Sequence, residues 1–135
     1  MDFSKFNLSE AAAAGATMVV RHPVTDEDLV GEDGRPVTIT VMGQDSRKFK
    51  ARVDFHLRSN ERSRKSQSLA QMERQSADML AHATVAWEGI EWEGQELDFS
   101  IENATMLYEK CGWLRKQVDE FVTEPANFFK DASQS

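Results

Sequence analysis

The sequence lacks most features that would place it in a specialised class of protein. Its 135 residues include one cysteine, Cys111, so no internal disulfide can form and nothing requires an oxidising compartment. No apolar run approaches the roughly 20 residues that a membrane-spanning helix needs. The N-terminal stretch carries Asp2 and Glu10 and no sustained apolar segment, unlike a secretory signal. We therefore expect a soluble cytoplasmic protein.

Motifs that bind cofactors or support catalysis are also missing. Neither the phosphate-binding pattern G-x-x-x-x-G-K-[ST] nor the dinucleotide-binding pattern G-x-G-x-x-G occurs. The three histidines, His22, His56 and His82, are far apart and lie outside metal-binding spacings. The acidic loop from Asp26 to Asp33 resembles the start of a calcium loop, but Val30 occupies its third ligand position. We expect a protein that is not an enzyme and holds no metal or cofactor.

The charge is unevenly distributed along the chain, whose net charge is −7. Residues 1–45 carry three basic and eight acidic side chains, and residues 86–135 carry four basic and eleven acidic ones. Residues 46–85 carry nine basic and four acidic side chains. The overall acidity argues against general affinity for nucleic acid, which needs a basic face. The basic segment 47–65 leaves a nucleic-acid-binding regulator open as an alternative.

The N-terminal half predicts a small antiparallel β-ribbon. Residues 1–16 are expected to form an arm with a short helical turn around Ser9 to Ala14. Thr17–Arg21 is apolar and β-branched, and Val37–Met42 alternates apolar residues with threonine, so both segments are typical of strands. A two-stranded ribbon is marginal in water, so it must pack on helices or on another subunit.

The segment from Lys48 to Arg58 fits two patterns. Its strict alternation of apolar and polar residues favours a strand, whereas Phe49, Val53 and Leu57 recur every four residues and favour one face of a helix. A helix-capping signal in Gly43–Ser46 decides for a helix.

The rest of the chain predicts helices separated by a glycine-rich turn. Residues 59–68 are polar all round, as in an exposed mid-helix or a break, and an amphipathic helix follows from Leu69 to about Ala86, with its end at Trp87. Residues 87–98 contain two glycines and predict a compact turn or short hairpin. Ser100 is a helix-start signal for a helix to about Lys110, and a second C-terminal helix covers residues 113–122. Residues 126–135 are expected to be a loose tail. The fold class is thus α+β: a mainly helical single domain over 1–135, with a long basic helix and two C-terminal helices.

Two kinds of side chain are candidates for contact with a partner. Most aromatic residues of the C-terminal half are expected in the core, but some suit a binding patch, because rigid aromatic side chains bind at low entropic cost. The Phe128-Phe129 pair, beyond the last helix breaker, is expected to be exposed. The basic side chains suit acidic partners, although a solvated helix face explains them equally well. The candidate contact residues are Trp92, Phe128, Phe129, Arg47, Lys48, Arg58 and Arg62.

An ordered set of segments carries a resemblance to a known family. The set comprises G-Q-D-S before the basic helix, A-T-V-A-W-E-G-I, G-Q-E-L-D-F-S-I-E-N-A-T-M-L-Y, W-L-R-K-Q-V-D-E-F-V and a late N-F-F. From about Thr17 to Phe129 the chain resembles the tail assembly chaperones of long-tailed bacteriophages. No single motif is specific, and the matching residues are scaffold positions, so the resemblance implies no catalytic site.

The resemblance implies a role in viral morphogenesis. Such chaperones act in the cytoplasm of the infected host cell, where they bind the tape measure protein and keep it soluble until tail tube subunits polymerise around it. They are usually absent from the mature virion and often self-associate. We expect the tape measure protein as partner, with the tail tube protein as a further candidate. A small virion component, such as a tail completion or connector protein, is the first alternative.

Overall fold

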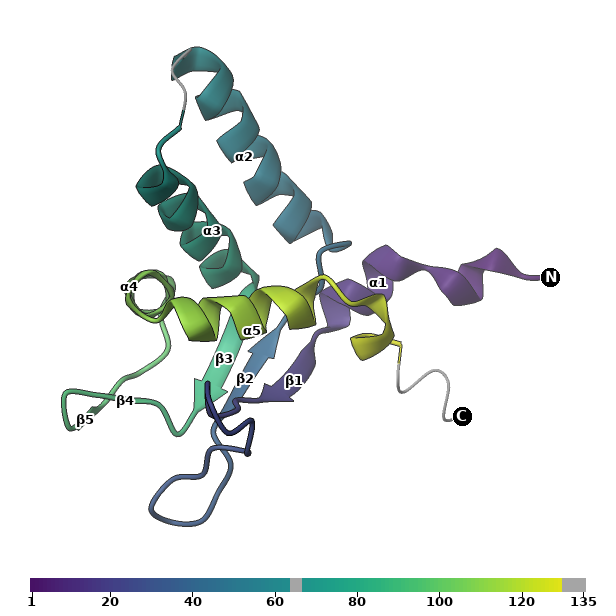
Figure 1. Ribbon diagram of the computed structural model, residues 1–135. Helices are drawn as coiled ribbons and strands as arrows, with labels where there is room; N and C mark the ends of the chain where they lie inside the picture. The colour runs from purple at the N-terminus through teal and green to yellow at the C-terminus, as the bar shows by residue number, and fades with distance from the viewer. Residues whose placement is uncertain (64–66, 130–135) are drawn as a thin grey trace.

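The computed structural model describes residues 1–63 and 67–129, and it shows a mainly helical α+β domain (Figure 1). The expected fold class is confirmed. The elements in chain order are η1 (Phe3–Phe6), α1 (Leu8–Ala14), β1 (Ala16–Val19), β2 (Thr38–Val41), α2 (Arg47–Ser63), α3 (Leu69–Ala83), β3 (Thr84–Glu88), β4 (Glu91–Trp92), β5 (Gln95–Glu96), α4 (Ile101–Lys110), α5 (Gly112–Val122) and η2 (Pro125–Asn127).

The main sheet has three antiparallel strands in the order β1-β2-β3. The predicted pairing of the two N-terminal segments is confirmed, but the helix expected to reach Ala86 is wrong because α3 ends at Ala83. The next four residues, T-V-A-W, are β-branched or aromatic at three positions and favour an extended chain. Trp87 lies opposite Ile39 in the sheet, and its indole N–H donates to the carbonyl of Leu97 at 2.7 Å. Burial of the Trp87 side chain against the core therefore favours strand β3 in preference to a longer helix α3.

The core lies on one face of this sheet, under α5 and the adjoining parts of α3 and α4 (Figure 1). Alternate strand residues supply the sheet side, as expected for a half-buried strand. The core residues are Met18, Val20, Ile39, Val41, Ala77, Leu80, Ala81, Trp87, Ile90, Ala104, Leu107, Tyr108, Leu114, Val118 and Val122.

The ambiguous segment after β2 is a helix, as predicted. Ser46 begins it, because its buried hydroxyl accepts from the backbone N–H of Phe49 at 3.2 Å. Phe49 packs against the core, whereas Leu57 is 56% exposed, so the apolar residues spaced by four do not all share a buried face. The outer part of α2 therefore extends beyond the core.

The C-terminal third confirms the predicted turn and helices. β4 and β5 form a hairpin whose two-residue turn, Glu93-Gly94, has positive φ angles of 51° and 81°, as in a type I′ turn. The Ser100 side chain accepts from the backbone N–H of Asn103 at 3.0 Å and caps α4. Gly112 is the first residue of α5.

The expected loose tail is wrong for residues 126–129. Pro125 begins the 3-10 helix η2, and the Glu124 carboxylate accepts from the backbone N–H of Ala126 at 3.0 Å. This turn directs Phe128 back onto the core, where its ring meets Phe121 edge-on with centroids 5.8 Å apart. Residues 130–135 lie outside the described part of the chain.

Candidate partner-binding surface

Helices α2 and α3 form a hairpin that projects away from the sheet (Figure 1). Polar side chains join the two helices, with Asp78 of α3 at the centre. Arg52 donates from Nε to Oδ2 of Asp78 at 2.6 Å and from Nη2 to Oδ1 at 3.0 Å, a bidentate pair. Nε2 of His56 lies 2.6 Å from the same Oδ2. The three side chains are 13–28% exposed, so water competes only partly for these contacts.

The electrostatic surroundings favour an ionised Asp78. Burial alone raises the pKa of a carboxyl, but the hydrogen bonds from Arg52 and His56, with the charge of Arg52, outweigh burial and lower the pKa of Asp78 below its ordinary value. His82, one turn later on α3, donates from Nδ1 to the backbone carbonyl of Asp78 at 2.8 Å. The same Nδ1 lies 3.5 Å from Oδ1 of Asp78, so two of the three histidines approach one carboxylate although they are distant in sequence.

A second polar layer lies nearer the tip of the hairpin. The side-chain amides of Asn60 and Gln75 bond reciprocally, at 2.8 and 3.4 Å, and Gln67 donates to both residues. These amides line a polar pocket of about 340 Å³ between the helices. We call the two layers together the polar seam: Arg52, His56, Asp78, Asn60, Gln67 and Gln75. Because each layer needs specific partners, the seam fixes the register of α2 against α3.

The outward face of α2 is basic. At 100° per residue, Arg47, Arg58 and Arg62 fall within about 60° of one another, and all are exposed, as is Lys48. The candidate basic residues therefore do gather on one helix. Arg58 lies 3.0 Å from Asp54, an exposed pair that leaves most of the positive charge available.

Large apolar side chains stand in solvent on the same hairpin. Phe55 and Leu57 of α2 are 52% and 56% exposed, and Leu69 and Met72 of α3 are 68% and 48% exposed. The Arg52 guanidinium covers the inner side of the Phe55 ring, 4.2 Å from its centroid. Phe55 lies beside Arg58 and Arg62, whereas Leu57 lies about 160° away from Phe55 around α2. Exposed apolar side chains next to basic ones are typical of a protein-binding surface.

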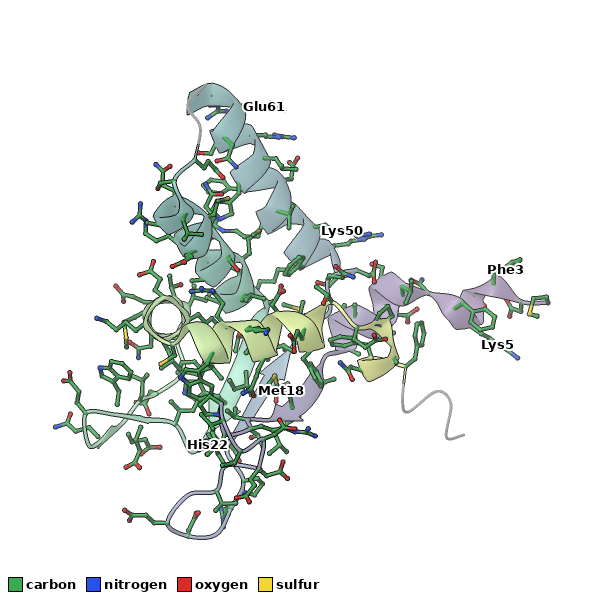
Figure 2. All side chains as sticks on the ribbon, in the orientation of Figure 1. Phe3, Lys5, Met18, His22, Lys50 and Glu61 are labelled. Atoms are coloured by element: carbon green, nitrogen blue, oxygen red, sulfur yellow. The ribbon has the colours of Figure 1, made fainter. Side chains whose placement is uncertain are left out.

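The N-terminal arm presents a second exposed apolar set. Phe3 is 77% exposed and Phe6 is 58% exposed, and Figure 2 shows Phe3 and Lys5 standing clear of the domain. Only the end of the arm is anchored: Ala12 is buried, and its carbonyl accepts from the N–H of Gly43 at 3.0 Å. The predicted arm is thus attached through α1.

The aromatic candidates lie away from the hairpin. Trp92 in β4 is half-buried and packs against the core, and Phe128 is likewise half-buried against it. The expectation that Phe128 and Phe129 form an exposed pair is wrong, because η2 turns the chain toward the domain and Phe129 is also half-buried. The structure therefore does not bring the aromatic and basic candidates into one site.

The polar seam was missed by reasoning from the sequence. Its signal was present as two pairs of polar residues spaced by four: Arg52 with His56, and Asp78 with His82. Such spacing places both members on one helix face, which a hydrophobic pattern does not reveal. Only the pairing of α2 with α3 shows that the two polar faces meet.

Two observations concern reactive chemistry in the described residues. They contain no group of three or more histidine, cysteine, aspartate or glutamate side chains placed to hold a metal ion. Burial raises the pKa of the Cys111 thiol, which disfavours the reactive thiolate. None of the helices in the described ranges combines the length and apolar character needed to cross a bilayer.

Comparisons of the chain with protein-family models, with curated proteins and with solved structures found no match. The resemblance to tail assembly chaperones therefore rests on the ordered sequence segments alone.

Proposed function

We propose that this protein is a non-enzymatic tail assembly chaperone that binds the phage tape measure protein in the host cytoplasm and keeps it soluble. The observation that carries the proposal is the projecting α2–α3 hairpin. It presents exposed apolar side chains beside a basic helix face. The sequence resemblance independently supports the same role.

The physics of the hairpin suits a helical client. A long helical protein without its tail tube exposes apolar stripes that aggregate in water. Leu57, Leu69 and Met72 offer apolar contacts to such a stripe, in the manner of helix-in-groove recognition. The arginines of α2 add attraction to acidic positions beside the stripe, and the net charge of −7 helps to keep the complex soluble.

Co-expression with the tape measure protein of the same phage tests the proposal. We expect the tape measure protein to stay soluble and to co-purify with this chain. The double variant Leu57→Ser, Leu69→Ser should lose this effect, because it removes apolar contact from both helices at exposed positions. Val85→Ser is the matched control, since Val85 is 50% exposed on the sheet, away from the hairpin. Equal precipitation of the tape measure protein with and without the chain would refute the proposal.

The basic face of α2 supports one competing function, a nucleic-acid-binding regulator. Retention of DNA or RNA at physiological ionic strength, lost in Arg58→Ala, Arg62→Ala, would favour that function. Presence of the chain in purified phage particles would instead favour a small virion component, such as a tail completion or connector protein.

A further inference from the structure

Strand β1 lies at one edge of the sheet, and part of its outer edge is unpaired. The N–H of Val20 donates to the carbonyl of Val37 at 2.9 Å, so the main-chain groups of Val20 and Met18 face β2. Those of Thr17 and Val19 consequently point away from the sheet. Within the described residues, no other segment forms a backbone hydrogen bond with Thr17 or Val19 on that side.

The next outward-facing residue, Arg21, shows how this edge accepts a partner. The amide of Gln117 on α5 accepts from the N–H of Arg21 at 3.0 Å and donates to its carbonyl at 2.7 Å. A side-chain amide thus makes the two hydrogen bonds that a neighbouring strand would make. Gln117 closes the edge at Arg21 and leaves two donors and two acceptors open at Thr17 and Val19.

A groove of about 660 Å³ runs along this open edge, between β1 on one side and α5 with η2 on the other. We call it the β1 groove. Met18 and Phe121 supply apolar parts of its lining. From Thr17 to Arg21 an extended chain covers about 13 Å, so the groove has room for an extended segment of about four residues. A strand beside a helix is the geometry used for recognition by strand addition.

The charge of the β1 groove lining indicates the charge that a partner needs. Asp26, Asp28, Glu120 and Glu124 line the β1 groove, and among the described residues that line it Arg21 is the one basic side chain. Arg21 already lies 3.5 Å from Asp26 and 3.8 Å from Asp28. A second copy paired edge to edge about a two-fold axis would bring the same acidic lining against itself, which is repulsive. The lining therefore favours a basic partner over self-association.

We propose that the β1 groove binds an extended basic segment of a partner protein by adding it as a fourth strand at β1. The segment pairs with the main chain of Thr17 and Val19. Its basic side chains face the carboxylates of Glu120 and Glu124 and those of the β1–β2 loop. This surface is separate from the α2–α3 hairpin and does not depend on the chaperone role.

The direct test uses a capped six-residue peptide of alternating lysine and valine, titrated into the isotopically labelled full chain. We expect amide chemical shift changes and slower hydrogen exchange at Thr17 and Val19. The same peptide with glutamate in place of lysine should not bind. The lysine–valine peptide with N-methyl groups on its pairing edge should bind roughly tenfold more weakly, because a lost main-chain hydrogen bond leaves its partner unpaired.

Two variants separate pairing from charge. Val19→Pro deletes one outward N–H at an edge position that tolerates proline, and it should weaken binding roughly tenfold, whereas Val19→Thr should not. Glu120→Gln, Glu124→Gln should weaken binding and reduce its salt dependence, with Glu109→Gln on α4 as the matched control. The proposal would be overturned if Val19→Pro left the affinity unchanged or if the glutamate peptide bound equally well. It would also be overturned by chemical shift changes confined to the α2–α3 hairpin, or by concentration-dependent dimerisation through Thr17 and Val19.

Discussion

The polar seam makes a quantitative prediction for Asp78→Asn. The substitution keeps the shape of the side chain but removes its charge, and the new amide NH2 faces the donors of Arg52 or His56. Asp78 accepts three hydrogen bonds from these residues at 2.6–3.0 Å. Hydrogen bonds to charged groups contribute about 1.5–3 kcal/mol each, and an asparagine oxygen retains part of one interaction. Because the carboxylate is 20% exposed, we expect a loss of about 2–3 kcal/mol rather than the larger cost of breaking a fully buried pair.

The loss should appear mainly as opening of α2, because α3 contributes core residues whereas the outer part of α2 depends on the seam. Amide hydrogen exchange should show protection in the middle of α2 falling about 30- to 150-fold, the equivalent of 2–3 kcal/mol. Glu73→Gln, at an exposed position of α3, is the control and should change protection little. If Asp78→Asn changes α2 protection no more than Glu73→Gln does, the seam does not hold the hairpin closed.

The same carboxylate gives the hairpin an acid dependence. The pKa of Asp78 is lower in the folded protein than its ordinary value of 3.8, because the hydrogen bonds and charges outweigh the opposing effect of burial. The stabilisation is therefore fully present above about pH 4 and is lost as the pH falls through the folded pKa. Asp78→Asn should lack this component of the acid transition, which exchange measurements between pH 3 and 5 can resolve.

Three further predictions test the core. Burial raises the pKa of Tyr108, the single tyrosine, to about 12. The stabilising contribution of the neutral Tyr108 side chain should therefore persist below about pH 10 and fall as the pH rises toward 12. Tyrosinate absorbance that titrates near pH 10 in the folded protein would contradict this prediction. Gly43→Ala should cost about 1–3 kcal/mol in urea unfolding, since the added Cβ would lie 2.9 Å from the Cβ of Ala12 and 3.0 Å from the ring of Phe128. Phe128→Ala should cost about 2 kcal/mol, whereas a cost near zero would mean that the ring does not pack on the core.

Local signals in the sequence predicted the elements whose ends carry a cap or turn. Ser100 begins α4, the Glu93-Gly94 turn joins β4 to β5, and the capping signal before Arg47 correctly resolved the helix–strand ambiguity of the next segment. In each case the deciding hydrogen bond or φ angle lies within a few residues of its own signal. Local signals of this kind can therefore be recognised in a single sequence.

The errors arose where distant residues decide the structure. Residues 84–87 continue the helical spacing of α3, but pairing with β2 makes them a strand, and that pairing depends on residues more than 40 positions earlier. Phe128 follows a helix breaker, as a loose tail would, but contacts from Phe121 and Gly43 return it to the core. Asp78 takes its partners Arg52 and His56 from α2, 26 and 22 positions earlier in the chain. Neither periodicity nor composition contains these long-range contacts.

The uneven charge along the sequence also does not reveal which charged residues come together in the fold. Six of the nine basic side chains of the central segment lie on the projecting helix α2, where Arg52 turns inward to Asp78 and the other five are exposed. The two acidic flanks, by contrast, combine: Asp26 and Asp28 from the N-terminal flank line the same groove as Glu120 and Glu124 from the C-terminal flank. Added salt should weaken binding at both surfaces, so salt dependence alone cannot tell them apart. Charge reversal can tell the two surfaces apart. The double variant Arg58→Glu, Arg62→Glu should weaken binding only of the hairpin partner, and Glu120→Lys should weaken binding only of the β1 groove partner. If either change impairs both partners equally, the two surfaces are not independent.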